Sequence, residues 1–383
     1  MRADVIIVGG GVIGCAIALK LARSRLKVAL IDRGRIGREA SWAAAGMLSP
    51  QTEAPGPGPF FDLCLQSRTI YPDWAADLED LSGVDVEYRN EGSLCVSLSP
   101  EEQTDAERWS AWQLEAGLRI DAVSPEALRK LEPAVTKSAT GALFVPGDHQ
   151  VENRRLMVAL DKALRTLGVE LIEERSVESV VVERGRATGV SFGSERVDGG
   201  AIVIAAGCWT SQLLGPIGIQ AETIPARGQM IALKGLRAPM NHVIHSSRCY
   251  VIPRRDGRVL IGATVEHVGF TKGITAAGIG SLLAAAVEIS PDLKSLEIVE
   301  MWSGLRPDTV DHLPILGPSG VDNLFLATGH FRNGILLAPI TAELVAKSIE
   351  TSGVPPPLLP FTIERFRSDL QPSSGIREAD APR

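Results

Sequence analysis

The stretch Asp4 to Asp32, DVIIVGGGVIGCAIALKLARSRLKVALID, contains a complete nucleotide-binding pattern. An apolar run, Val5 to Val8, enters a glycine-rich turn and an amphipathic segment, and a second apolar run, Val28 to Ile31, ends on Asp32. Short apolar runs bounded by turn residues are typical of buried strands, and apolar residues three or four apart are typical of a helix. The stretch therefore predicts a strand, a turn, a helix and a strand.

Three glycines of this turn have separate functions in holding a dinucleotide. Gly9 permits the tight turn, Gly11 lets the backbone approach a pyrophosphate, and Gly14 lets the helix pack closely on the strand. The pyrophosphate would lie at the helix N-terminus, where unpaired N–H groups and the helix dipole favour an anion. Asp32 is placed to accept hydrogen bonds from an adenosine ribose, and its charge disfavours NADP. The stretch alone does not distinguish FAD from NAD.

The composition sets wider limits. The chain has 383 residues, which exceeds what a single core usually holds, so we expect two domains. A net charge of −7 argues against a nucleic-acid partner, because phosphate binding needs a basic surface. The five cysteines are scattered without CxxC spacing, which indicates neither a disulfide framework nor a metal site. No signal peptide and no apolar run of about 18 residues is present, so a cytoplasmic protein without a transmembrane segment is expected.

Hydrophobic periodicity predicts the remaining elements. Helices are expected at 62–81, 101–116, 125–131, 153–167 and 275–289, and strands at 92–98, 169–172, 176–183, 187–192, 200–206, 226–233 and 324–328. Ser41 to Met47 is expected to be close-packed backbone with a helix start capped by Ser41, or else a tightly packed alanine helix. Pro355 to Pro357 predicts an extended segment, and residues 366–383 predict a tail without regular structure.

A hairpin is predicted around Asp256-Gly257, because this pair between apolar runs is a strong hairpin signal. If these two residues form the turn, Tyr250 pairs with Ala263 and Arg248 pairs with Val265. All four side chains would then share one face of the hairpin.

Five segments in this order resemble the D-amino acid oxidase superfamily, and within it the glycine oxidases of thiamine biosynthesis. They are the glycine turn with Asp32, SWAAAGML (41–48), AAGCW (205–209), GLRPDTVDHLPILG (304–317) and GHFRNGILLAP (329–339). The resemblance implies a mixed α/β fold, with a Rossmann-like FAD-binding domain and a discontinuous substrate domain built on an antiparallel sheet. The expected FAD-binding domain comprises 1–60, 143–220 and 300–365, and the expected substrate domain comprises 61–142 and 221–299.

The same resemblance selects FAD over NAD and implies which residues contact it. The implied contacts are Val12, Ile13, Asp32, Arg33, Ala40, Ser41, Ala45, Gly46 and Met47, with Val177 beside the adenine and His330, Phe331, Arg332, Asn333, Gly334, Ile335 and Leu336 around the isoalloxazine edge. A helix beginning near Asn333 would stabilise the negative charge of a reduced flavin. No cysteine matches the covalent flavin link of sarcosine oxidases, so FAD is expected to bind non-covalently.

For the substrate, the resemblance implies Arg306 and Arg332, with Tyr250. A planar carboxylate suits the two parallel donors of a guanidinium. The implied reaction is oxidative deamination of glycine, or of sarcosine or a small D-amino acid, to an imine or glyoxylate and ammonia, with O2 reduced to H2O2. No side-chain base is expected and no metal. The implied protein partners are a thiazole synthase that uses the imine and, in a homo-oligomer, further copies of the chain.

Two positions depart from the glycine oxidases. Arg248 stands where a histidine is familiar and Val265 where a methionine is, so both are candidates for reshaping the substrate pocket; alternatively, Arg248 points to solvent. Two other functions stay open at this point. One is a D-amino acid or sarcosine dehydrogenase that passes electrons to a quinone or carrier. The other is a non-catalytic flavin-binding subunit, which would be expected to lack the arginine clamp.

Overall fold

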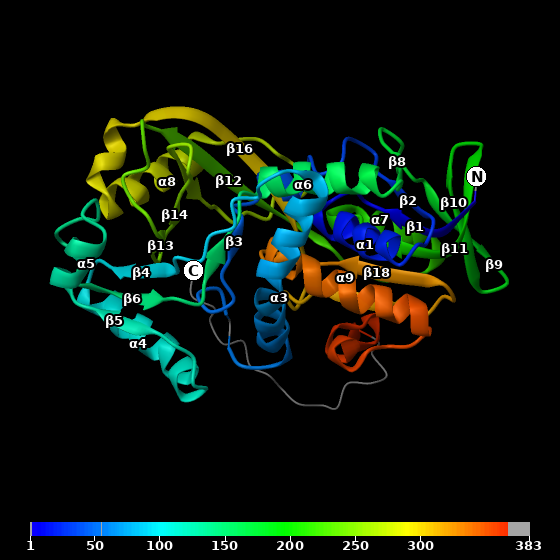
Figure 1. Ribbon diagram of the computed structural model, residues 1–383, viewed down its shortest axis with the longest axis horizontal. Coiled ribbons are helices and arrows are strands. Elements are labelled where there is room, and N and C mark those ends of the chain that lie inside the picture. Colours follow the sequence, from blue (N-terminus) through cyan, green and yellow to red (C-terminus); the bar gives the residue numbers. More distant parts are fainter. Residues whose placement is uncertain (1, 55, 367–383) are drawn as a thin grey trace.

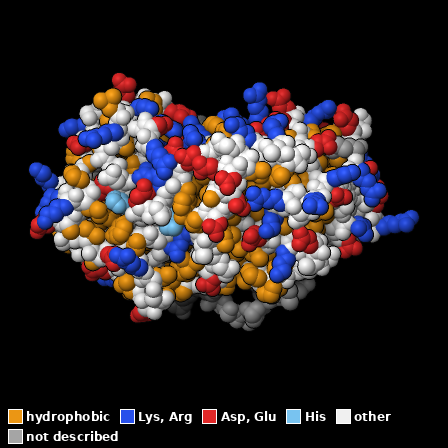
Figure 2. Space-filling model, in the orientation of Figure 1, with side chains coloured by type: hydrophobic (Ala, Val, Ile, Leu, Met, Phe, Trp, Pro, Cys, Tyr) orange, Lys and Arg blue, Asp and Glu red, His pale blue; other side chains and the backbone are white. Residues whose placement is uncertain are grey.

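The computed structural model describes residues 2–54 and 56–366. Two eight-stranded sheets form two lobes side by side, with the helices α1 and α9 in one lobe and α4, α5 and α8 in the other (Figure 1). The space-filling view shows an indentation between the lobes at its upper edge, and acidic and basic side chains are interspersed over this face (Figure 2). The predicted C-terminal tail, apart from Phe366, lies outside the described residues.

The first sheet has a parallel centre in the order β17-β18-β11-β1-β2-β8, with a β9–β10 hairpin extending from β11. Its strands are β1 (Arg2–Val8), β2 (Val28–Ile31), β8 (Glu170–Ile172), β9 (Ser179–Glu183), β10 (Arg186–Phe192), β11 (Glu195–Ile204), β17 (Ile315–Pro318) and β18 (Leu324–Thr328). Only β17 and the β9–β10 hairpin run antiparallel to their neighbours. This arrangement confirms the strand-turn-helix-strand prediction at the N-terminus.

Helices cover one face of the first sheet. Since alternate residues of a strand point to opposite faces, the two faces have separate cores. Val5 and Ile7 of β1 pack in the core beneath the helices, whereas Ile6 and Val8 pack on the opposite face. The covering helices are α1 (Val12–Arg23), α3 (Pro59–Ser82), α6 (Asn153–Thr166) and α9 (Gly334–Thr351). The opposite face is closed by the β9–β10 hairpin and the short helix α7 (Thr210–Leu214).

The second sheet has the order β16-β12-β15-β14-β13-β4-β6-β5. Its strands are β4 (Ser93–Ser97), β5 (Asp121–Val123), β6 (Gly141–Val145), β12 (Ile224–Lys234), β13 (Val243–His245), β14 (Tyr250–Pro253), β15 (Arg258–Gly262) and β16 (Glu297–Asp308). It is antiparallel as predicted, except that β13 pairs parallel with β4. The helices α4 (Pro100–Glu115), α5 (Pro125–Leu131) and α8 (Ala276–Ile289) belong to this lobe.

The chain passes between the two sheets several times, so each lobe is built from discontinuous segments. The second sheet includes β6 and β16, and these strands extend across the expected boundaries at 143 and 300. A small ladder between β3 (Met47–Leu48) and β7 (His149–Gln150) joins the segments that connect the lobes. The division into domains at these boundaries stays a prediction.

Two local predictions were wrong. Tyr250 pairs with Gly262 instead of Ala263, because the hairpin loop has three residues, Arg255 to Gly257, and Arg254 N–H donates to the carbonyl of Arg258. Pro356–Phe361 forms a 3-10 helix instead of an extended segment. Among the described residues, no helix is both long and apolar enough to cross a membrane.

Candidate functional site

A cavity of about 420 Å³ lies where the two sheets meet. Gly9 and Asp32, which directly follow β1 and β2 of the first sheet, line its wall together with Gly228 and Tyr250 of the second sheet. Most residues predicted to contact FAD line it: Gly9, Gly11, Val12, Ile13, Asp32, Arg33, Ala40, Ser41, Ala45, Gly46, Met47, Val177, His330, Phe331, Arg332, Gly334 and Ile335. The structure thus brings together residues from both ends of the chain.

Three residues predicted to contact the cofactor do not line the cavity. Gly14 packs inside the turn, where an added Cβ would lie 1.9 Å from the carbonyl oxygen of Gly9. Asn333 is the N-cap of α9, and Leu336 is buried behind the cavity wall, with its carbonyl accepting a hydrogen bond from Ser67. These three residues support the walls of the cavity.

The glycine turn forms a narrow cradle at the N-terminus of α1. Gly9 has a φ of +110°, and an added Cβ would lie 2.2 Å from the carbonyl oxygen of Ala205. The Asp32 carboxylate holds this turn, because it accepts hydrogen bonds from Gly10 N–H at 2.7 Å and Gly34 N–H at 2.8 Å. Asp32 thus has a structural function in addition to its predicted contact with a ribose.

Ser41 differs from its prediction as a helix cap. The helix α2 (Ala40–Ala43) begins two residues earlier than a cap at Ser41 requires, with Glu39 as its N-cap and no side-chain cap. The Ser41 hydroxyl instead accepts a hydrogen bond of 2.9 Å from the backbone N–H of Val12. This contact fixes α2 against the first turn of α1, at the predicted position of the pyrophosphate.

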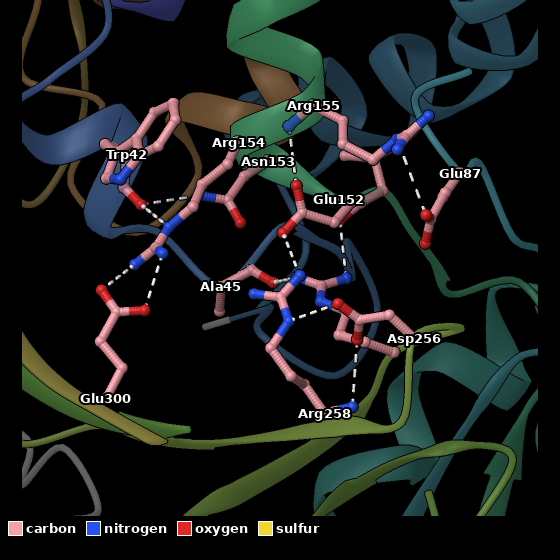
Figure 3. A network of polar contacts seen from close by, with 12 residues as sticks. Trp42, Ala45, Glu87, Glu152, Asn153, Arg154, Arg155, Asp256, Arg258 and Glu300 are labelled. Carbon is pink, nitrogen blue, oxygen red and sulfur yellow. Dashed lines mark hydrogen bonds and ion pairs between the residues drawn. The ribbon is translucent and has the colours of Figure 1, made fainter. Parts of the chain in front are cut away.

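A polar network holds α2 between the lobes (Figure 3). Asn153 and Arg154, at the start of α6, both donate to the carbonyl of Trp42, and Arg154 also forms a bidentate contact with Glu300 of β16 at 2.8 and 2.9 Å. The buried Arg254 donates to the carbonyl of Ala45 at 2.6 Å. The segment from Trp42 to Ala45 is therefore fixed by helix α6 on one side and by the β14–β15 hairpin of the second sheet on the other.

The N-terminus of α9 forms another part of the wall. Asn333 precedes the helix, which confirms the predicted start. His330 is 3% exposed, and its Nε2 lies 3.1 Å from the hydroxyl of Thr341. Burial lowers the pKa of His330 to about 3, so this imidazole is neutral near pH 7. The positive potential at this wall comes from the helix end and from Arg332.

Tyr250, Arg306 and Arg332 line one end of the cavity, where both guanidinium groups interact electrostatically with the Tyr250 hydroxyl, and Val265 also lines the cavity. The Arg306 guanidinium lies over Gly228, where a Cβ would come within 2.4 Å of it, and donates to the carbonyl of Thr264 at 3.1 Å. Within the described part of the chain, neither Arg306 nor Arg332 has a carboxylate within 4 Å. Two cationic groups are thus available to an anion from solution.

A carboxylate that we did not predict, Glu53, lies at the same end. It lines the cavity, half-buried, and interacts electrostatically with both Arg332 and Arg306. Burial raises the pKa of Glu53 to about 7, although the two guanidinium groups oppose this change. Its local sequence gave no signal, since one glutamate in a loop near several prolines resembles a solvated residue.

Arg248 does not belong to this group. It lies in a turn before β14, is exposed, and pairs with Glu288 of α8. The predicted register, which placed it opposite Val265, was wrong. Of the two departures from the glycine oxidases, only Val265 therefore lines the cavity.

The segment from Ala205 to Trp209 also lines the cavity, at the end of β11, where we expected a strand to meet a ligand. Cys208 lies in this segment and donates to the carbonyl of Leu305 at 3.4 Å. Burial raises the pKa of its thiol to about 12, so it stays protonated near pH 7. Trp209 lies against Arg33, whose guanidinium carbon is 3.5 Å from the ring centroid.

The glycine positions on the cavity wall suit the close backbone approach that an adenine dinucleotide requires. The glycine cradle at Gly9 has a counterpart at Gly46, where a Cβ would lie 2.1 Å from the carbonyl of Val151. Residues 4–348 match the protein family described as FAD dependent oxidoreductase. The chain belongs to this family. FAD is therefore its cofactor, and the predicted mixed α/β fold with a Rossmann-like FAD-binding part is confirmed.

Individual relatives that match most of this chain have names more specific than the family description. The chain is 36% identical to a glycine oxidase from Geobacillus kaustophilus (strain HTA426), over 95% of this chain and 97% of that protein. A crystal structure of glycine oxidase from Geobacillus kaustophilus superposes with a TM-score of 0.91 at 33% identity, covering 95% of this chain and 99% of the other.

A bifunctional protein ThiO/ThiG from Synechocystis sp. (strain ATCC 27184 / PCC 6803 / Kazusa) is 38% identical over 96% of this chain. The match covers 55% of that relative. The chain thus spans about half the length of this bifunctional protein.

Proposed function

We propose that this protein is an FAD-dependent amine oxidase that acts on glycine, with sarcosine and small D-amino acids as further substrates. The observation that carries the proposal is the pair of guanidinium groups of Arg306 and Arg332 beside Tyr250, at one end of the cofactor cavity. A small amino acid presents one carboxylate that would match them. The glycine oxidase from Geobacillus kaustophilus, which matches nearly the full length of this chain, supports glycine as the first substrate to test.

The contribution of the chain is to orient the substrate and to supply electrostatic stabilisation. Arg306 would bind the substrate carboxylate through two parallel hydrogen bonds, and its contact with the Thr264 carbonyl restricts its rotation. The N-terminus of α9 adds positive potential to the cavity wall. FAD, when bound, would supply a hydride acceptor for the substrate carbon, and its reduced form would be reoxidised by O2 with formation of H2O2.

FAD would be held non-covalently. The one described cysteine on the cavity wall, Cys208, is buried and directs its thiol to a backbone carbonyl. In a test by acid precipitation, the yellow cofactor should stay in the supernatant. Colour remaining in the protein pellet would contradict a non-covalent site.

The decisive experiment is anaerobic reduction of the bound flavin by glycine, sarcosine and a panel of D-amino acids. Arg306→Ala should weaken glycine binding by roughly 2 to 5 kcal/mol, because it removes a charge-assisted bidentate partner. Arg108→Ala is a matched control, since Arg108 is exposed on α4 and pairs with Asp105. Equal glycine affinity in wild type and Arg306→Ala would show that Arg306 does not bind the substrate carboxylate.

The same protein under air tests the electron acceptor. Peroxide released with each glycine oxidised would support an oxidase, whereas turnover with an added dye only would indicate a dehydrogenase. We also propose a thiazole synthase as the partner that uses the imine. This proposal is supported by the fused ThiO/ThiG relative, of which the chain matches 55%. Co-purification of the two proteins from a common host would test it.

A further inference from the structure

The substrate end of the cavity contains three groups that are charged when Glu53 is ionised: the carboxylate of Glu53 and the guanidinium groups of Arg306 and Arg332. Glu53 interacts electrostatically with both arginines, yet no ion pair within 4 Å joins it to them or to another described residue. Its side chain also accepts no hydrogen bond from the described part of the chain. A half-buried carboxylate without a protein donor takes its hydrogen bonds from water or from a ligand in the cavity.

The loop that carries Glu53 is anchored, so its side chain is directed into the cavity by the fold. Thr52 donates its hydroxyl hydrogen to Asp148 at 2.5 Å, and Gln51 N–H donates to the same carboxylate at 3.3 Å. The N–H of Glu53 donates to the carbonyl of Ser49 at 3.2 Å, which closes the turn. Ordering before binding lowers the entropy cost of recognising a ligand.

A bound amino acid would supply the missing donor. Its amino nitrogen is one carbon away from its carboxylate, so a site that binds the carboxylate through arginine needs an acceptor close by for the amino group. Glu53 is the cavity-lining acidic residue that interacts with Arg306, Arg332 and Tyr250 together. An N–H donor placed between these groups would satisfy the carboxylate of Glu53.

We propose that Glu53 faces the substrate's amino group and selects amines that carry one carboxylate over amines that carry a second anionic group on nitrogen. This inference rests on the proposed amine oxidase function. With Glu53 ionised, the formal charges of Glu53, Arg306 and Arg332 add up to one positive charge, which one substrate carboxylate neutralises. A second carboxylate on the nitrogen would lie against Glu53, and like charges brought together at a binding surface are strongly disfavoured.

The selectivity should depend on pH, since a protonated Glu53 no longer repels an anion. The groups that act on Glu53 are Arg332 and Arg306, which favour its ionised form, and Asp148, which disfavours it; Tyr250 and Cys64 also interact with it. Burial raises the pKa of Glu53 to about 7. Selectivity against dianions should therefore be greatest well above this pH and should decline below it.

The test measures binding of two analogues that cannot be oxidised as amines, methoxyacetate and diglycolate, to the FAD-loaded protein by calorimetry. They differ in the second carboxylate. Well above pH 7, Glu53→Gln should lower the ratio of the diglycolate dissociation constant to the methoxyacetate dissociation constant by about tenfold or more. Below the pKa of Glu53, the ratio measured for wild type should approach the ratio measured for Glu53→Gln. Glu53→Asp should restore part of the selectivity, and Asp62→Asn, an exposed carboxylate on α3, should leave the ratio as in wild type.

The outcomes separate this inference from the proposed function. An unchanged ratio in Glu53→Gln, with glycine still oxidised by wild type, would overturn the role of Glu53 and leave the amine oxidase intact. A shifted ratio in a protein that oxidises none of the tested amines would support Glu53 as a selector of anions and contradict the proposed oxidase. A ratio that shifts equally in Asp62→Asn would overturn the inference, because net charge alone would then explain it.

Discussion

At the scale of single residues, His330 has an environment that links stability to pH. It is buried beneath the start of α9, and burial lowers its pKa to about 3, whereas an unfolded chain has an ordinary histidine pKa of about 6.5. Because the folded pKa is the lower one, the unfolded chain binds more protons than the folded chain between these two values. The contribution of His330 therefore destabilises the fold progressively as pH falls below about 6.5.

Replacing His330 by glutamine should reduce this pH dependence. Between about pH 6 and pH 4, the free energy of unfolding should fall less steeply with falling pH in His330→Gln than in wild type. The difference between the two slopes should be about 1.4 kcal/mol per pH unit. Urea unfolding at several pH values measures both slopes. His267→Gln is the control, because His267 is exposed. Parallel curves for wild type and His330→Gln would contradict the buried neutral state.

At the scale of elements, the close approach of α1 to β1 depends on Gly14. Glycine to alanine inside a helix ordinarily stabilises by about 1 kcal/mol. An added Cβ at Gly14 would lie 1.9 Å from the Gly9 carbonyl oxygen, and overpacking of this kind costs about 1 to 3 kcal/mol. The unfavourable contact exceeds the gain, so Gly14→Ala should lower both the melting temperature and the affinity for FAD.

Gly11→Ala separates packing from cofactor binding. The nearest atom to an added Cβ at Gly11 is the Ser41 hydroxyl at 3.3 Å, and the φ of −72° suits alanine. This variant should lower the melting temperature of the FAD-free protein much less than Gly14→Ala does, but it should bind FAD more weakly, because its methyl group would approach the pyrophosphate. Melting curves without FAD and titrations with FAD distinguish the two variants. Equal melting temperatures for all FAD-free forms would refute the packing function of Gly14.

The elements were largely predictable, because periodicity and glycine positions are local properties of the sequence. The five helices predicted from helical spacing are present within a few residues of their expected bounds, as α3, α4, α5, α6 and α8. The hairpin register was not predictable, because Asp256-Gly257 suits a two-residue turn and also a three-residue loop that ends on a glycine of positive φ. Gly257 has a φ of +86°, which fits the longer loop.

The candidate site was predicted through the resemblance, mostly inside the segments that carry it. Val177, Tyr250 and Val265 lie outside those segments and also line the cavity. Arg306 and Arg332 stand in segments that resemble a family, so they could be named. Glu53 reaches the same cavity through the loop that Asp148 anchors, and such a contact between distant segments leaves no local pattern. Arg248 was misplaced because its position depended on the hairpin register.

At the scale of the whole molecule, FAD should bind the two lobes to each other, since the cavity wall includes Asp32 from the first lobe and Tyr250 from the second. A ligand that binds only the folded state stabilises it by about 2.7 kcal/mol at a concentration 100 times its dissociation constant. Removal of FAD should therefore lower the melting temperature by several degrees, and re-addition should raise it in proportion to the logarithm of the FAD concentration. ADP, which lacks the flavin, should occupy the adenosine end at the first lobe alone and restore only part of the shift. Full restoration by ADP would contradict a cofactor that contacts both lobes.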